Sequence, residues 1–217
     1  MTAVAHAGAL PQEQRFTLDD VDWAFYESVL QRVGDRHIFV TYDRGRIEIM
    51  APSWRHDESS RLIGLLIHIM GEEFGVALKG GGSTTFRRED LQRGLEADQC
   101  FYTRNLDRIR GRREIDLGVD PPPDLAVEVE ITRRMLPRQS LYEAIGVPEL
   151  WRYDGRELTI CVLGPDRRYV VVEASPTFPH VRPQQMAAWV AAGEDLDDIA
   201  WARMVRQAIA SGTRPAR

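Results

Sequence analysis

The segment 123–131, which reads PDLAVEVEI, constrains the fold of this chain more than any other. Apolar and acidic side chains alternate along it, and alternation with a period of two is the pattern of a β-strand. Its apolar side chains therefore share one face, while Asp124, Glu128 and Glu130 share the other. Desolvating an unpaired carboxylate is expensive, so a buried strand rarely carries such a row. The row indicates either a cation site or a solvent-facing side whose carboxylates pair with arginines.

A second acidic strand is predicted over 95–103, where Glu96 and Asp98 share a face. If the two acidic strands are neighbours, Asp98, Glu128 and Glu130 could form one oxygen-rich pocket. Hard divalent cations such as Mg²⁺ or Mn²⁺ prefer such ligands. An ion held there could activate a water molecule and neutralise charge on a phosphodiester in the transition state.

The remaining pattern predicts an α/β or α+β fold with one mixed sheet flanked by helices. The clearest helix is predicted over 57–74, where apolar residues recur at i, i+3, i+4, i+7 and i+8. These residues are Leu62, Leu65, Leu66, Ile69 and Met70. Other helices are expected after Thr17 and over 136–145, 182–192 and 195–210. Further strands are expected over 37–42, 46–50, 84–88, 149–154, 158–163 and 169–172, the first two joined as a hairpin.

The length of 217 residues suits one domain, which we place over 16–211. Residues 1–15 are expected to be a flexible N-terminus and 212–217 a tail. The longest nearly apolar run spans 62–70, whereas a membrane-spanning helix needs about 20 residues, so no membrane association is expected. Cys100 and Cys161 form no CxxC pattern, which favours reduced thiols and a cytoplasmic protein.

Nearly all positive charge in the chain comes from arginine, since Lys79 is the only lysine. Five arginines fall in the loop 104–113, namely Arg104, Arg108, Arg110, Arg112 and Arg113. They could contact the phosphates of a nucleic-acid backbone, or the loop could simply be solvated. The net charge of −5 gives no overall attraction to nucleic acid, so binding must depend on a local patch.

Three stretches of the sequence resemble one known family. They read EADQCFY, IDLGVDPPPDLAVEVEITR and LYEAIGVPELWRYDG, and the resemblance extends over 39–172. They are similar to the Uma-two family of endonucleases, within the PD-(D/E)xK, or restriction-endonuclease-like, superfamily. The resemblance implies a restriction-endonuclease-like fold with a central mixed sheet and a metal-dependent phosphodiesterase site.

The resemblance also implies roles for individual residues. Asp98 and Glu128 would be the two motif carboxylates that bind Mg²⁺ or Mn²⁺, and Glu58 would be an additional acidic ligand on the helix that follows His56. The motif expects a lysine two residues after Glu128, where this chain has Glu130.

Arginine stands at a second position where a lysine would be expected. Related proteins often carry a lysine four residues before a tyrosine on the following helix, and that position is Arg138, before Tyr142. Arg138 could hold a phosphate, but it cannot exchange a proton. Glu130 could help to recruit a second cation.

The leading hypothesis is therefore a cytoplasmic, Mg²⁺- or Mn²⁺-dependent endonuclease that acts on nucleic acid, with DNA favoured as the substrate. Asp98, Glu128, Glu130 and Arg138 would form the site, and double-strand cutting would favour a homodimer. The alternative is a catalytically degenerate nuclease fold that binds nucleic acid or associates with itself. A phosphoesterase of small substrates is a third class, for which no particular residue argues.

Overall fold

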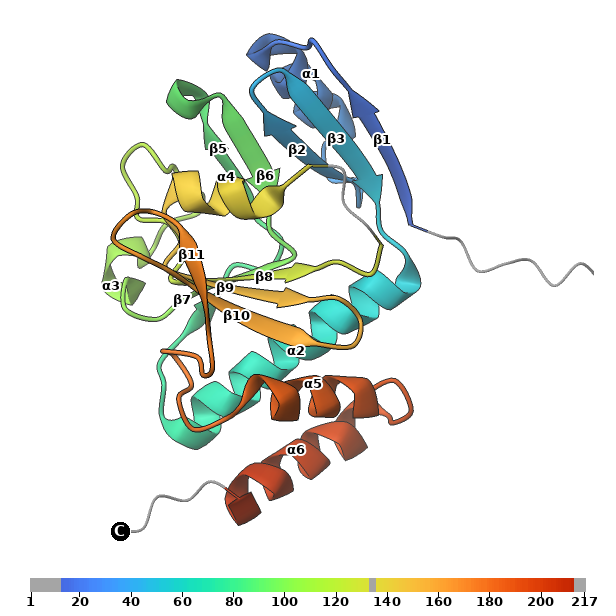
Figure 1. Cartoon of the computed structure of the whole chain (residues 1–217), viewed down its shortest axis with the longest axis vertical. Helices are drawn as coiled ribbons and strands as arrows, with labels where there is room; N and C mark the ends of the chain where they lie inside the picture. The colour runs from blue at the N-terminus through green and yellow to red at the C-terminus, as the bar shows by residue number, and fades with distance from the viewer. Residues whose placement is uncertain (1–12, 133–135, 213–217) are drawn as a thin grey trace, which may run out of the picture.

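The computed structural model describes residues 13–132 and 136–212, which form two β-sheets with helices packed against them (Figure 1). The first sheet has the strand order β1-β3-β2-β6-β5, and all its pairs are antiparallel. Its strands are β1 (Gln14–Leu18), β2 (Phe39–Asp43), β3 (Arg46–Ala51), β5 (Thr85–Arg88) and β6 (Arg93–Glu96).

The second sheet is mixed and has the order β11-β10-β9-β8-β7-β4. Its strands are β4 (Lys79–Gly80), β7 (Gln99–Tyr102), β8 (Leu125–Val129), β9 (Glu149–Tyr153), β10 (Leu158–Leu163) and β11 (Tyr169–Val172). β8 and β9 run parallel, whereas the other pairs are antiparallel. A parallel pair needs a crossover connection, and the helix α4 lies in it.

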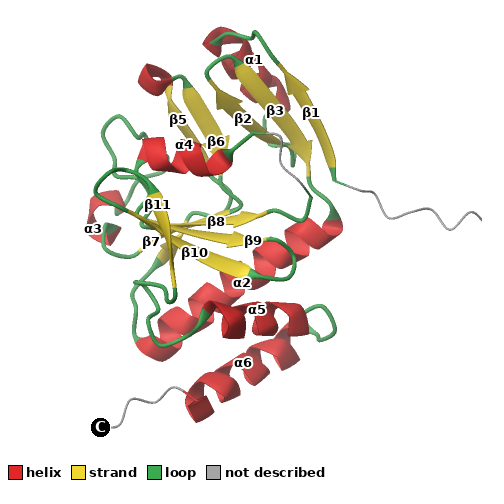
Figure 2. Ribbon diagram, viewed as in Figure 1, coloured by secondary structure: helices red, strands yellow, loops and turns green. Residues whose placement is uncertain are grey.

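The helices cover both faces of the second sheet, with α2, α5 and α6 on one side and α4 in the corner between the two sheets (Figure 2). The α-helices are α1 (Trp23–Val33), α2 (Trp54–Phe74), α3 (Leu106–Ile109), α4 (Arg138–Ile145), α5 (Pro183–Ala192) and α6 (Asp198–Gly212), and a 3-10 turn spans Glu89–Leu91. None of the helices in the described ranges is long and apolar enough to cross a bilayer.

The alternation along 123–131 is confirmed by the way β8 divides the core. Leu125, Val127 and Val129 belong to the large cluster that β8 shares with α2, α5 and α6. Ala126 belongs to the cluster on the opposite face, together with Tyr142 of α4. Glu128 points to the α4 side as well, and every residue of β8 is buried. At Glu128, therefore, the acidic face of β8 is buried and does not face solvent.

Helix α2 follows its predicted course, beginning at Trp54, three residues before the expected start. Ser53 caps it by accepting a hydrogen bond from the backbone N–H of His56, and Gly75 ends it in the left-handed conformation, with φ of 69°. Leu65, which we assigned to the buried stripe, is 39% exposed, and Ile63 and Ile67 are buried in its place. The core contacts α2 on more than one face, so the buried stripe is wider than a simple period indicates.

One strand prediction and the expected N-terminal boundary need correction. Residues 95–103 form two strands, since β6 belongs to the first sheet and β7 to the second, and the chain passes between them at Ala97 and Asp98. Residues 14–18 form the edge strand β1, so Gln14 and Arg15 are part of the folded unit and the first helix begins at Trp23. Residues 1–12 and 213–217, where we expected a flexible terminus and a tail, lie outside the described residues.

The expected fold class is confirmed, and the hairpin, the last three strands and the two C-terminal helices form where the sequence predicts them. The sequence indicated one mixed sheet. The structure has that mixed sheet and adds an antiparallel sheet built largely from the N-terminal third.

Candidate active site

The passage from one sheet to the other places Asp98 beside β8. Its side chain is fully buried, and its Oδ2 accepts a hydrogen bond of 2.6 Å from the backbone N–H of Val129. The backbone of β7 pairs antiparallel with β8, Gln99 lying opposite Val127. β7 is therefore the neighbour of β8, and Asp98, which directly precedes β7, lies beside β8, whereas Glu96 belongs to the first sheet.

Glu128 lies near the end of β8 and faces the first turns of α4. The Nη2 atom of Arg138 lies 3.0 Å from Oε1 of Glu128, and both side chains are 1% exposed. Tyr142, one turn further along α4, donates its hydroxyl to the same carboxylate oxygen. Arg138 also donates to the backbone carbonyl of Glu96 at the end of β6. One buried guanidinium thus connects the site to both sheets.

The electrostatics of this group follow from its burial. Burial raises the pKa of the Tyr142 hydroxyl well above its usual value, and the charge of Glu128 raises it further. Burial acts to lower the pKa of Arg138, but the surrounding groups, Glu128 first and then Tyr142, Asp98 and Glu48, raise that pKa on balance. Tyr142 therefore stays protonated as a donor, and Arg138 keeps its charge beside both carboxylates.

His56 is a site residue that the sequence analysis missed. It is fully buried, and its Nε2 lies 3.4 Å from Oδ2 of Asp98. Its Nδ1 lies 3.7 Å from Asp57, and Asp57 in turn contacts the exposed His37 at 2.9 Å. No spacing in the sequence distinguished His56 from a capping residue, because the contact with Asp98 depends on how α2 packs.

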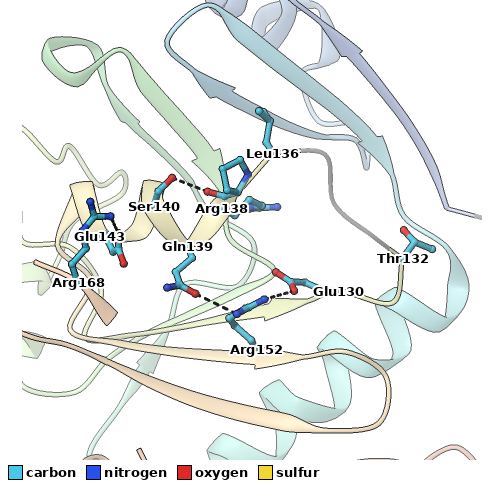
Figure 3. Close-up of a pocket in the computed structure, with 10 residues that line it drawn as sticks. Glu130, Thr132, Leu136, Arg138, Gln139, Ser140, Glu143, Arg152 and Arg168 are labelled. Carbon is cyan, nitrogen blue, oxygen red and sulfur yellow. Dashed lines mark hydrogen bonds and ion pairs between the residues drawn. The ribbon is translucent and has the colours of Figure 1, made fainter. Parts of the chain in front are cut away.

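Glu130 faces a cavity beside α4 (Figure 3). Its Oε2 lies 2.8 Å from Nη2 of Arg152, which stands opposite Glu128 in the β8–β9 pairing. The other Nη atom of Arg152 donates to the side chain of Gln139 on α4, at 3.2 Å. Glu130, which stands where the superfamily motif has a lysine, therefore holds Arg152 in place.

The four carboxylates proposed as metal ligands are not brought together. Glu58 follows His56 by two residues, so it lies about 200° around α2 from the side chain that contacts Asp98. Within the described residues, no three or more His, Cys, Asp or Glu side chains are grouped to hold a metal ion. Asp98 and Glu128 remain, and Mg²⁺ is commonly bound through one or two carboxylates with water completing its shell. Asp98 and Glu128 supply oxygen ligands of the kind that such an ion prefers, whereas Glu58 leaves α2 in a different direction from His56.

A second buried carboxylate cluster supports the entry to α4. Glu48 of β3 is 1% exposed. Its carboxylate accepts a hydrogen bond from Arg15 of β1 at 2.9 Å and another from the backbone N–H of Leu136 at 3.3 Å. Glu48 also lies close enough to Arg138 to raise its pKa. The antiparallel sheet thus contributes a charge to the surroundings of the site, which the pattern of β3 did not indicate.

Several arginines of the 104–113 loop are engaged by acids of the same region. Arg104 lies 3.7 Å from Asp124, Arg110 lies 2.7 Å from Asp107, and Arg112 lies 3.1 Å from Asp120. Asp124 also accepts hydrogen bonds from the backbone N–H groups of residues 103, 104 and 105. Asp124 therefore holds the turn after β7 in place. The 104–113 loop is a folded segment that contains α3.

The chain is similar to known proteins both in sequence and in fold. A family model described as "Uma2: Putative restriction endonuclease" matches residues 25–192. This chain belongs to the Uma2 family. A search of curated protein sequences finds no match.

One solved structure with a similar fold comes from Anabaena variabilis ATCC 29413 and is described as a putative nuclease belonging to DUF820. It is 16% identical, covers 70% of this chain and 90% of its own, and has a TM-score of 0.51. At that identity the likeness shows the fold alone. The Uma2 match shows the family and supports a nuclease as the class of protein, and the similar structure agrees with the restriction-endonuclease-like fold.

Proposed function

We propose that this Uma2 protein is a Mg²⁺- or Mn²⁺-dependent endonuclease whose metal is held by Asp98 and Glu128, with DNA as the favoured substrate. The observation that carries the proposal is that two buried carboxylates, Asp98 and Glu128, both lie close enough to Arg138 to act on its charge, in a chain of the Uma2 family. Such a metal ion, when bound, would lower the pKa of a water molecule and neutralise charge on the phosphate.

The residues of the chain would orient the reactants. The Val129 N–H and His56 both contact Oδ2 of Asp98, so they fix the direction of that carboxylate. Arg138 and Tyr142 do the same for Glu128. Arg138 also supplies positive charge for a phosphate, but it cannot act as a base because a guanidinium keeps its proton. Proton transfer would therefore have to proceed without the motif lysine.

The experiment is cleavage of plasmid DNA with Mn²⁺ by the wild type, Asp98→Asn and Glu128→Gln. These substitutions keep the shape of each side chain, so folding can be matched by circular dichroism. Glu173→Gln, which changes an exposed carboxylate, is the matched control. We expect cleavage to fall by at least about 100-fold in the two site variants and to persist in the control. Equal cleavage by all four proteins would refute the assignment.

A second candidate, the catalytically degenerate binding module, is favoured by one observation. Arg138 already neutralises Glu128, and the carboxylates in the described part of the chain form no three-ligand group. If wild-type protein binds DNA but cuts neither DNA nor RNA with Mg²⁺ or Mn²⁺, this candidate replaces the first. A homodimer and a cytoplasmic location remain part of the proposal. A homodimer suits double-strand cutting, and a cytoplasmic location suits two buried free thiols.

A further inference from the structure

A cavity of about 570 Å³ opens between α4 and the strands β8 and β9 (Figure 3). That volume is in the range of small-ligand sites. Arg138 lines it and also contacts Glu128, so the cavity adjoins the candidate active site directly. A substrate strand positioned at Glu128 can therefore extend into it.

The cavity wall carries arginines that are oriented before any ligand arrives. Arg152 is held by Glu130 at 2.8 Å and by Gln139 at 3.2 Å, and 37% of its side chain is still exposed. Arg168, in the loop between β10 and β11, is held by Glu143 at 3.0 Å and is 73% exposed. Fixing a guanidinium in advance lowers the entropy lost when it binds an anion.

The first turn of α4 also forms part of the cavity wall. Gln139 and Ser140 belong to that turn and line the cavity. The N-cap position, Pro137, makes no side-chain hydrogen bond to the helix. The first turn of α4, at the positive end of the helix dipole, therefore belongs to the same wall as Arg152 and Arg168.

The other large hollow of the molecule is less suited to an anion. It lies beside α1, β5 and the 109–117 loop, and among the described residues it balances its cations with acids. Its charged side chains are Arg36, Lys79, Arg87, Arg112 and Arg113 against Glu27, Glu89, Glu96, Glu114 and Asp116. The α4 cavity differs in that its two partly exposed arginines, Arg152 and Arg168, are each held in place by a glutamate of the same wall, while the charge of Arg138 is already paired with Glu128.

We propose that the α4 cavity binds a phosphate group of the nucleic-acid backbone next to the one positioned at Glu128, with Arg152 and Arg168 as its contacts. The inference rests on the proposed nuclease function and deepens it. It places backbone binding at α4, and it assigns no such role to the predicted loop 104–113. Because only phosphate is recognised, the contact is independent of base sequence.

The test is equilibrium binding of a fluorescein-labelled 20-base-pair DNA duplex, followed by anisotropy in EDTA, so that neither metal nor cleavage enters the readout. The variants are Arg152→Ala, Arg168→Ala and their double. Arg203→Ala on α6 removes one exposed charge far from the cavity lining and is the matched control. Arg110→Ala tests the predicted loop.

We expect Arg152→Ala and Arg168→Ala each to weaken binding about five-fold, for two unrelated duplex sequences alike, and to reduce the salt dependence by about one phosphate contact. Arg203→Ala and Arg110→Ala should bind within two-fold of the wild type. Because Arg168 is largely exposed, its removal leaves the fold intact even if Arg152→Ala, which frees Glu130, does not.

The inference is overturned if the double variant binds as the wild type does, if the control weakens binding equally, or if the wild type fails to bind the duplex. Asp98→Asn separates it from the proposed function. If DNA binding depends on the two arginines while Asp98→Asn cleaves as the wild type does, phosphate binding in the cavity is supported and the catalytic assignment is refuted. If Asp98→Asn loses cleavage while DNA binding does not depend on Arg152 or Arg168, the catalytic assignment is supported and the phosphate site in the cavity is refuted.

Discussion

The guanidinium of Arg138 lies 3.0 Å from the carboxylate of Glu128, with 1% of either side chain exposed to solvent. A buried ion pair of this kind contributes little net stability, but losing one partner leaves the other as an uncompensated charge. The pair therefore makes each residue dependent on the other, whatever the site does chemically.

Replacing Arg138 should consequently destabilise the fold. We expect Arg138→Met to lower the free energy of unfolding by about 3–5 kcal/mol, measured by urea denaturation, and Arg138→Met with Glu128→Gln to recover most of that loss. Arg168→Ala breaks a pair whose arginine is 73% exposed and should cost less than about 1 kcal/mol. An unchanged midpoint in Arg138→Met would contradict this account of the pair.

Gly94 of β6 makes room for Tyr26 of α1. A Cβ at this position would collide with the phenol of Tyr26, which is fully buried and stacks on Tyr42 with ring centroids 5.2 Å apart. Gly94→Ala should destabilise the fold by about 1–3 kcal/mol, because the ring cannot move away. Gly212→Ala, where an added Cβ meets no neighbour, is the control and should be near neutral.

Tyr26→Phe provides the second half of that test. The Tyr26 hydroxyl is buried and accepts or donates no hydrogen bond within the described residues, so its removal alone should change stability little. In the Gly94→Ala background the same change should restore part of the lost stability, because the hydroxyl is the closest atom to the added Cβ. Additive effects in thermal unfolding would show that the two residues do not collide.

The thiol of Cys100 should be inert in the native protein. Burial raises its pKa to about 11, so at pH 8 only about 0.1% of it is thiolate, the reactive form. Burial also raises the pKa of Cys161. We expect neither thiol to react with Ellman's reagent within minutes unless denaturant is added, whereas an exposed cysteine introduced by Ser211→Cys should react at once. Rapid native labelling of the wild type would count against this.

Glu96 should make the fold less stable at neutral pH than in mild acid. Burial raises the pKa of its carboxyl group, so the folded state binds its proton more tightly than the unfolded state does. Its contribution to stability is greatest below its ordinary pKa and falls as pH rises through the raised value. Glu96→Gln should therefore raise the melting temperature at pH 7 and change it little at pH 4.

The hydroxyl of Ser83 donates a hydrogen bond of 2.7 Å to Glu96. A glutamine at position 96 can still accept this hydrogen bond, so the substitution tests the charge alone. Glu173→Gln, at an exposed position, should shift the melting temperature equally at both pH values. A Glu96→Gln variant that is stabilised only at pH 4 would reverse the predicted sign.

The periodic elements of this fold could be predicted because their patterns are local. The alternation in β8 and the apolar spacing of α2 depend on neighbours along the chain, and both elements form where the sequence indicates. The edge strand β1 was missed because its pattern is short and its pairing partner, β3, lies about thirty residues away. Nothing within 14–18 records that contact.

The candidate site divides in the same way. The sequence identified Asp98, Glu128 and Arg138 through the acidic strands and the family motifs, and the structure brings these three together. It could not identify His56 or Glu48, since each reaches the site only through the packing of α2 or of the first sheet. It also placed Glu58 with the carboxylates, although the turn of α2 directs that residue elsewhere.

The sequence by itself determined that this chain has an acidic central strand, an arginine where a lysine would serve as a base, and a restriction-endonuclease-like fold. Only the tertiary structure decided that 95–103 breaks between two sheets, that Arg138 is buried against Glu128, and that Glu130 holds Arg152 beside a cavity. Periodicity follows from the backbone geometry of single segments. Charge pairing in the interior depends on desolvation and on distances between segments remote in the chain, which no local pattern encodes.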